Sequence, residues 1–169
     1  MHTYKDVFAW PYKDLVGVPT SEGVHTIPLL EGARPVRGRA YKLNPKYAEA
    51  VRVELKKSEK ARIIIPVEHS DWLSPMVIAP KKQTNKIRVW VNFCALNKVI
   101  VKDGFLMPFC ERVLKDVARR SLYNFMDEFS GYNQIAIHPD HQAKTVFVTP
   151  WSTFVYTTMA FELQCPAYI

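Results

Sequence analysis

The chain has 169 residues, of which 48% are hydrophobic, and a formal net charge of +7. This length and composition are those of one globular domain of ordinary size, and they exclude a disordered chain. The sequence contains neither an apolar run of about 20 residues, which a membrane span needs, nor the apolar core of a signal peptide, so we expect an intracellular protein, cytoplasmic or nuclear, without a membrane partner.

The first 43 residues are predicted to form an extended lead-in or linker. Prolines and glycines recur in residues 1–32 without helical or strand periodicity, which is typical of an extended segment. They are Pro11, Gly17, Pro19, Gly23, Pro28 and Gly32.

A helix is predicted from Pro45 to about Ala61. Asn44 is a suitable N-cap residue, and proline fits the first helical position. Apolar side chains then recur at helical spacing, at Tyr47, Ala48, Val51 and Leu55.

The positive charge is concentrated around this helix. Residues 33–62 contain ten Lys or Arg and three acids. A basic segment of this kind suits a polyanion such as nucleic acid, and the structural alternative is a solvated helix face. On the first interpretation, the nucleic-acid contacts of the helix are Arg52, Lys56, Lys57 and Lys60.

The next segments are predicted to form strands. RIIIPV (62–67) is a short buried strand, and residues 76–80 and 87–93 are two β-rich runs that predict a hairpin with a lysine-rich tip. Residues 109–118 are predicted to form a second helix with an apolar face, made of Phe109, Val113, Leu114 and Val117.

After this helix, a strand is predicted at residues 122–126, followed by a tight turn. Three more strand-like runs follow, at residues 134–138, 145–149 and 154–158. The order of elements indicates an α+β fold with antiparallel pairing, and not the regular alternation of a doubly wound sheet.

Asp127 lies where the strand at 122–126 is expected to give way to the turn. A carboxylate there is costly to bury unless a positive group lies against it. As a metal ligand it would offer the oxygen that Mg²⁺ prefers, with the carbonyl of the next residue close by. As a structural residue it would cap the turn. Tyr132, a few residues further on, is either the wall of a nucleotide sugar pocket or a core tyrosine.

The hairpin tip gathers cations: Lys81, Lys82, Lys86 and Arg88 lie within eight residues. Arg is a bidentate ligand for phosphate and Lys a point charge. The tip is therefore either a phosphate-binding loop or an ordinary solvated turn.

Taken in order, these motifs resemble a known family. SPMVIAPKK, KIRVWVNFCALNK, FMDEFSGYNQIAI and KTVFVTPWSTFVYTTMAFELQCPA resemble the reverse transcriptase domain of gypsy-type LTR retrotransposon polyproteins. YKDVFAWPYKDL, PVRGRAYKLNPKYAEAV and IIIPVEHSDWLSP resemble the segment that joins this domain to an upstream protease. The resemblance covers nearly the whole chain.

The resemblance implies a right-hand polymerase fold, with the fingers and the first part of the palm, including an antiparallel sheet. Residues 1–43 would be the connection from the protease, and residues 44–169 a partial reverse transcriptase domain. The implied activity is RNA-directed DNA polymerisation, with a template-primer and a dNTP as partners.

The resemblance also implies roles for single residues. Asp127 would be the first catalytic aspartate and a ligand of Mg²⁺ or Mn²⁺, with the Glu128 carbonyl as a secondary ligand. Tyr132 would contact the nucleotide sugar, Arg88 and Lys81 the triphosphate, and Phe161 would lie beside the nucleotide pocket.

The sequence also departs from the family pattern. Nucleotidyl transfer through two metal ions needs a cluster of carboxylates. In the family, the carboxylates other than Asp127 come from a YxDD-type hairpin, which is expected beyond Ile169. Asn92, Cys94 and Glu162 stand where the family has Asp, Arg and Gly, and each change weakens the nucleotide site.

We therefore expect the chain to be inactive alone and to self-associate through an unpaired palm edge. Two alternatives remain: a nucleic-acid-binding remnant without catalysis, and a decayed retroelement product.

Overall fold

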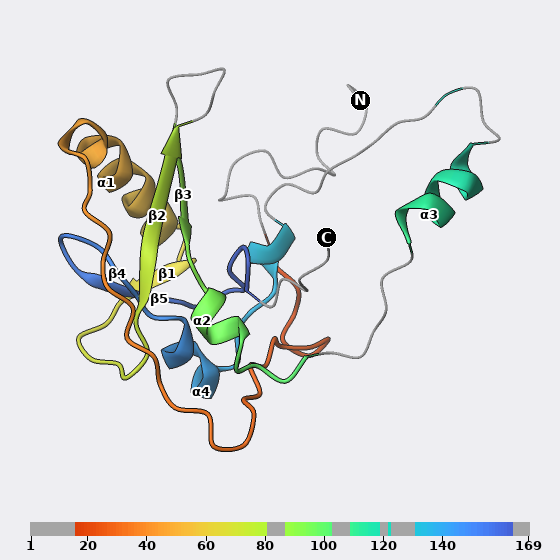
Figure 1. Cartoon of the computed structure of the whole chain (residues 1–169), viewed down its shortest axis with the longest axis horizontal. Helices are drawn as coiled ribbons and strands as arrows, with labels where there is room; N and C mark the ends of the chain where they lie inside the picture. The colour runs from red at the N-terminus through yellow and green to blue at the C-terminus, as the bar shows by residue number, and fades with distance from the viewer. Residues whose placement is uncertain (1–15, 81–86, 103–108, 119–121, 123–130, 164–169) are drawn as a thin grey trace.

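The computed structural model describes residues 16–80, 87–102, 109–118, 122 and 131–163. Figure 1 shows a sheet flanked by a long helix, α1, with the short helices α2 and α4 near its base. The elements are α1 (Pro45–Lys60), β1 (Ile64–Pro66), β2 (Ser74–Pro80), β3 (Ile87–Val91), α2 (Cys94–Asn97), α3 (Cys110–Val117), the 3-10 helix η3 (Gly131–Gln134), α4 (Pro139–Gln142), the 3-10 helix η4 (Ala143–Thr145), β4 (Phe147–Val148) and β5 (Thr153–Tyr156).

The helix α1 begins where the sequence predicts. The Asn44 side chain accepts a hydrogen bond from the Lys46 N–H (3.0 Å), and Pro45 occupies the first helical position. Val51 and Leu55 are buried on the predicted apolar face. The start and the orientation of this helix are thus confirmed.

The end of α1 is closed by Arg62, which has a left-handed backbone with a φ of 55°. Its N–H donates to the Glu59 carbonyl (2.9 Å), and the Ile63 N–H donates to the Ser58 carbonyl (3.0 Å). This pair of bonds is a Schellman motif, which satisfies carbonyls that lack partners at the end of a helix. The chain passes from it directly into β1.

The five strands form one sheet in the order β1-β5-β4-β2-β3. The pairs β1/β5, β4/β5 and β2/β3 are antiparallel, so the predicted hairpin is confirmed. However, β2 and β4 are parallel, so the sheet is mixed and the prediction of an antiparallel sheet is wrong for this pair. The connection between these two strands contains β3 and several helices, and parallel pairing needs a long crossover of that kind.

The later strands are shorter than predicted. β4 and β5 cover parts of two predicted runs, but residues 134–138, which are all described, form isolated bridges instead of a strand. Gln134 ends η3 and Pro139 begins α4. Too few extended residues remain between them for a β-ladder.

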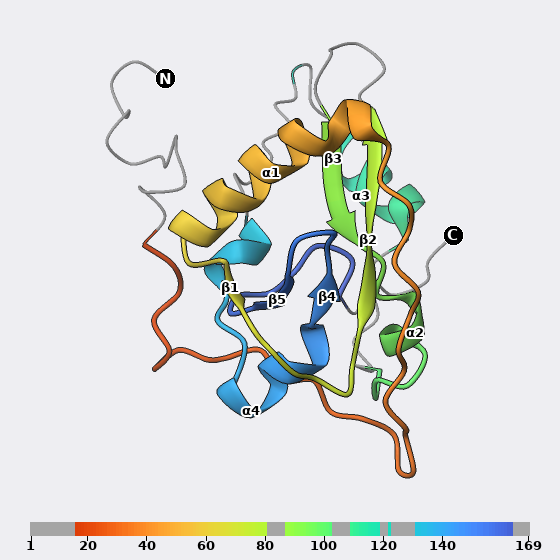
Figure 2. The same cartoon turned by 90° about the vertical axis from the view of Figure 1, so that its left-hand side faces the viewer.

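The buried residues form one continuous cluster that joins α1, the sheet and the lead-in. Figure 2 shows α1 running from beside the paired strands β2 and β3 towards β1, so that a single helix reaches both edge strands. The cluster includes Ile27, Val51, Leu55, Ile64, Phe93, Leu96, Phe147 and Phe154.

The described part of the lead-in, residues 16–43, packs against this body. Ile27 is fully buried. Its N–H donates to His141 Nδ1 (2.6 Å), and its carbonyl accepts a hydrogen bond from Lys144 Nζ (2.7 Å). We call this arrangement of Ile27, His141 and Lys144 the lead-in clamp. The division of the chain at residue 43 stays a prediction.

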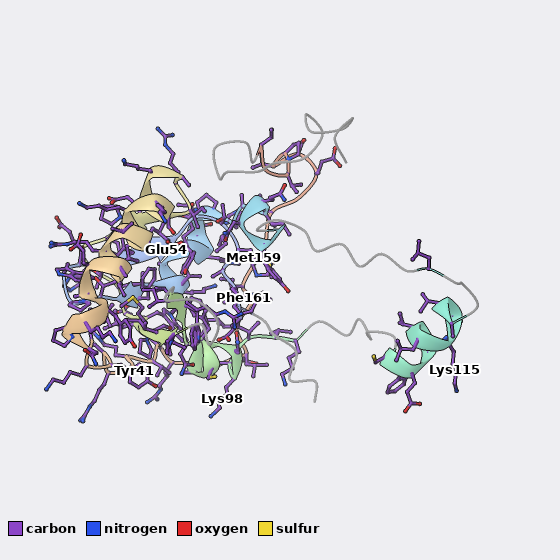
Figure 3. All side chains as sticks on the ribbon, turned by 90° about the horizontal axis from the view of Figure 1, so that it is seen from above. Tyr41, Glu54, Lys98, Lys115, Met159 and Phe161 are labelled. Atoms are coloured by element: carbon purple, nitrogen blue, oxygen red, sulfur yellow. The ribbon has the colours of Figure 1, made fainter. Side chains whose placement is uncertain are left out.

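The predicted helix at 109–118 is present as α3, and it lies apart from the sheet in Figures 1 and 3. Its apolar residues are all exposed: Phe109 by 84%, Val113 by 44%, Leu114 by 54% and Val117 by 36%. The strand predicted at 122–126 lies outside the described residues except for Leu122, which is not in a strand. None of the described helices combines the length and apolarity needed to cross a membrane.

Candidate nucleotide site

Arg88 projects from β3, an edge strand of the sheet. It pairs with Ala79 in the antiparallel register of the hairpin, and it is exposed. The hairpin therefore fixes the backbone of this cation, and its side chain is exposed.

Tyr132 and Phe161 are brought together from two separate segments. Tyr132 belongs to η3, and Phe161 follows the bridge that joins Ala136 to Thr158. Their ring centroids are 5.9 Å apart, with an angle of 80° between the planes. This edge-to-face contact is a favourable arrangement of aromatic rings, and both rings remain more than half exposed, Tyr132 by 52% and Phe161 by 61%.

Arg88 and Phe161 line one cavity of about 360 Å³. Residues of α1, β1, β3, β5 and η3 complete its wall, among them Glu54, Ser58 and Asn133. Glu54, on α1, and Phe161, after β5, both line the cavity, and both are labelled in Figure 3. The cavity is thus lined by an arginine and by Phe161, whose ring also contacts Tyr132, which suits a ligand with an anionic part and a ring.

Two of the residues that depart from the family pattern hold the backbone near this cavity. The Glu162 carbonyl accepts a hydrogen bond from Asn97 Nδ2 (2.7 Å), which ties the segment after Phe161 to α2. The Asn92 side chain accepts a hydrogen bond from the Cys94 N–H (2.9 Å) at the start of α2, a local turn that asparagine commonly makes.

The sequence-predicted metal ligands, Asp127 and Glu128, lie outside the described residues, and so does Lys81. Among the described residues, no group of three or more His, Cys, Asp or Glu side chains is arranged to hold a metal ion. A carboxylate and a backbone carbonyl are the oxygen donors that Mg²⁺ prefers. The chemistry of Asp127 and Glu128 therefore fits this ion, and their role stays a prediction.

The four predicted nucleic-acid contacts lie on α1, and all four are exposed. Lys57 forms an ion pair with Glu54 (3.2 Å). The guanidinium carbon of Arg52 lies 5.2 Å from the centre of the Trp151 ring. The sequence interpretation missed Trp151, although a tryptophan next to Pro150 in a predicted turn was a signal that an aromatic ring is held at the surface.

No protein-family profile matches the chain, but several known proteins are similar to it. The uncharacterized protein K02A2.6 of Caenorhabditis elegans is 30% identical over 168 residues, which cover 95% of this chain and 13% of that protein. The retrovirus-related Pol polyprotein from transposon 412 of Drosophila melanogaster is 25% identical, over 80% of this chain and 11% of that protein. The corresponding polyprotein from transposon gypsy is 27% identical, over 77% and 13%.

Solved structures with the same fold are those of foamy viral protease-reverse transcriptases. A prototype foamy virus protease-reverse transcriptase has a TM-score of 0.77 and 18% identity, over 95% of this chain and 21% of that chain. A foamy viral enzyme in complex with an RNA/DNA hybrid has a TM-score of 0.68 and 19% identity, over 83% and 19%. A complex with dsDNA has a TM-score of 0.71 and 20% identity, over 94% and 33%.

The homologues of the chain are therefore Pol polyproteins of retrotransposons and related viruses. The chain spans a small part of each of them, 13% of the first relative and 11% of the second.

Proposed function

We propose that this chain is the fingers and first part of the palm of a reverse transcriptase, and that the cavity between β3 and Phe161 receives an incoming dNTP. The observation that carries the proposal is that Arg88 and Phe161 line one cavity and that Tyr132 packs against Phe161. These three residues come from separate motifs of the sequence, and the family resemblance assigned each of them to the nucleotide.

In this proposal each wall of the cavity binds one part of the nucleotide. The Arg88 guanidinium donates to the triphosphate oxygens, a pairing in which arginine makes two parallel hydrogen bonds. Lys81 adds a second cation. Tyr132 contacts the sugar, and the edge of Phe161 holds the Tyr132 ring in place.

We also propose a metal and a second partner. Asp127 and the Glu128 carbonyl would hold Mg²⁺ or Mn²⁺, which supplies charge neutralisation for phosphoryl transfer. The template-primer is proposed as the second partner because structures of similar fold contain dsDNA and an RNA/DNA hybrid. RNA-directed DNA polymerisation is the activity to which these parts contribute.

The proposal is tested by binding of a fluorescent dNTP to the purified chain in the presence of Mg²⁺. Arg88→Gln is expected to weaken binding by at least about tenfold, because a hydrogen bond to a charged group contributes about 1.5–3 kcal/mol. Arg112→Gln removes the same charge from α3 and is expected to bind as the wild type does. Asp127→Asn is expected to remove the dependence of binding on Mg²⁺.

Two outcomes would contradict the proposal: equal affinities of the Arg88→Gln and Arg112→Gln variants, or binding that Tyr132→Ala leaves unchanged. Primer extension with Mg²⁺ and four dNTPs then measures catalysis separately from nucleotide binding. Any extension activity is expected to disappear in the Asp127→Asn variant.

A further inference from the structure

The outer face of α1 carries a row of cations. Arg52, Lys56 and Lys60 recur at every fourth residue, so their side chains follow one another along the helix with a rise of about 6 Å between them. All three are exposed. Within the described part of the chain, the ion pair formed by an α1 lysine is that of Lys57 with Glu54, so the three cations of the row are not neutralised in this way.

Two exposed acids, Glu49 and Glu59, lie on α1 at positions close to the row. Over the whole helix, five exposed cations stand against them: Lys46, Arg52, Lys56, Lys57 and Lys60. A polyanion is therefore attracted to α1, and its affinity is expected to depend on salt.

A rigid turn between β4 and β5 holds an aromatic side chain at the Arg52 end of the row. Thr149 is buried, and its Oγ1 accepts hydrogen bonds from the Trp151 N–H (3.3 Å) and the Ser152 N–H (3.1 Å). The same hydroxyl donates to the Ser152 carbonyl (2.6 Å). Trp151 thus has a fixed backbone, while its side chain stays 39% exposed.

Arg52 and Trp151 form a single platform. The guanidinium carbon lies 5.2 Å from the ring centre, the geometry of a cation–π contact. The guanidinium group of arginine and the ring of tryptophan are both planar. In proteins that bind single strands, unpaired bases stack on groups of these two kinds.

This surface is separate from the nucleotide cavity. Glu54 and Ser58 line the cavity, and each lies two residues after a member of the row, Arg52 or Lys56. Two residues correspond to about 200° around an α-helix. The row and the cavity therefore lie on opposite faces of α1, and an inference about one does not depend on the other.

We propose that Arg52, Lys56, Lys60 and Trp151 form a binding surface for single-stranded nucleic acid. The three cations bind phosphates along the strand, and an unpaired base stacks on the Trp151–Arg52 platform. A duplex would meet the same cations but would offer the tryptophan no free base. An acidic protein would use the cations and would have no need of the aromatic ring.

The test measures binding of the full chain to labelled single-stranded DNA, single-stranded RNA and a duplex of the same length. Trp151→Leu is expected to lose at least about fivefold in affinity for the single strands, the lower end of what stacking on an aromatic residue contributes. Its affinity for the duplex is expected to stay unchanged. Comparison of the affinities for single-stranded DNA and single-stranded RNA shows which of the two nucleic acids is preferred.

The cation row is tested by the salt dependence of binding. The triple variant Arg52→Gln, Lys56→Gln and Lys60→Gln is expected to reduce the log–log slope by about 2, because each contact to a single strand contributes about 0.7. The matched control removes three exposed cations from other parts of the chain, at Lys98, Lys102 and Lys115. This control is expected to keep the wild-type slope.

A second measurement protects the test against misfolding of Trp151→Leu. Base stacking quenches tryptophan fluorescence, and the quenching by a single strand is expected to be lost in the milder variant Trp151→Phe. Three results would overturn the inference: equal loss of single-strand and duplex binding in Trp151→Leu, equal slopes for the two triple variants, or unchanged quenching in Trp151→Phe. Binding of polyglutamate as tightly as the oligonucleotides would likewise overturn it.

Discussion

Glu162 adopts a left-handed backbone conformation, with a φ of 67°. This conformation costs a residue with a Cβ atom about 1–2 kcal/mol, whereas glycine adopts it freely. The hydrogen bond from Asn97 Nδ2 to the Glu162 carbonyl holds the backbone in place. The resemblance implies glycine at this position, and the observed φ is one that glycine adopts without strain.

Replacing Glu162 with glycine is expected to stabilise the protein. The gain is about 1 kcal/mol, because relief of the left-handed strain exceeds the added freedom of the unfolded chain. It is measured as a higher urea midpoint at an unchanged m-value. Glu162→Gln removes the charge but keeps Cβ, so this control is expected to show no gain. An equal effect of both variants would assign the strain to the carboxylate and not to the backbone.

At the scale of elements, the lead-in clamp makes stability depend on pH. Burial, followed by the positive charge of Lys144 and by His138, lowers the pKa of His141 from its ordinary value of 6.5, against an opposing effect of Asp140. Burial, followed by His141, also lowers the pKa of His25. The lowered pKa values favour the neutral form of both rings in the folded protein, and neutral His141 Nδ1 can accept the hydrogen bond from the Ile27 N–H.

Because these pKa values are lower in the folded state, the unfolded chain binds more protons as the pH falls. The free energy of unfolding is expected to fall as the pH drops below the ordinary value of 6.5, until the folded histidines are themselves protonated. Urea unfolding at a series of pH values measures this change. His141→Asn keeps an acceptor for the Ile27 N–H, and the asparagine side chain does not bind a proton in this pH range. The free energy of unfolding of this variant is therefore expected to depend less on pH than that of the wild type. His69→Asn, which replaces an exposed histidine, is the control. If it weakened the pH dependence of unfolding as much as His141→Asn does, the role of the lead-in clamp would be contradicted.

The sequence predicted those elements whose signals are local. Asn44 and Pro45 are adjacent and specify the start of α1, and the β2–β3 hairpin joins strands that follow one another. The bond from Ile27 to His141 joins residues 114 positions apart, and the parallel pairing of β2 with β4 is similarly remote. Such contacts depend on how the whole chain packs, which no local pattern expresses.

The candidate site shows the same limit. Arg88, Tyr132 and Phe161 were identified through the family resemblance, because an isolated residue of each type is more often structural. The residues themselves did not show that Arg88 and Phe161 would line one cavity, or that Tyr132 would contact Phe161. Trp151 was missed because a single aromatic residue in a turn has no periodicity, and its contact with Arg52 crosses from α1 to the β4–β5 turn.

At the scale of the whole molecule, the sheet ends in two edge strands, β1 and β3. Within the described residues, β1 has one strand neighbour, β5, and it presents Ile65 with 41% of its surface exposed. An unpaired edge with an apolar side chain is a template for pairing with a second chain. We propose that this edge mediates self-association.

The expected result is a mass that rises above 19.5 kDa as the protein concentration increases in sedimentation equilibrium. Ile65→Lys is expected to keep the chain monomeric, because a lysine on an edge strand opposes pairing. Val113→Lys places the same charge on the exposed face of α3 and is expected to leave the association intact. A constant monomer mass for the wild type would exclude self-association, and equal effects of the two variants would exclude β1 as its site.

The position of the lead-in also sets an order of folding. Residues 16–43 are synthesised long before His141 and Lys144, the residues that hold Ile27. Contacts between such distant parts of a chain form late, since the entropy of closing a long loop must be overcome first. During synthesis, the lead-in clamp can therefore close only after the segment that carries α4 has left the ribosome, whereas the contact of Gly38 with Leu73 can form much earlier.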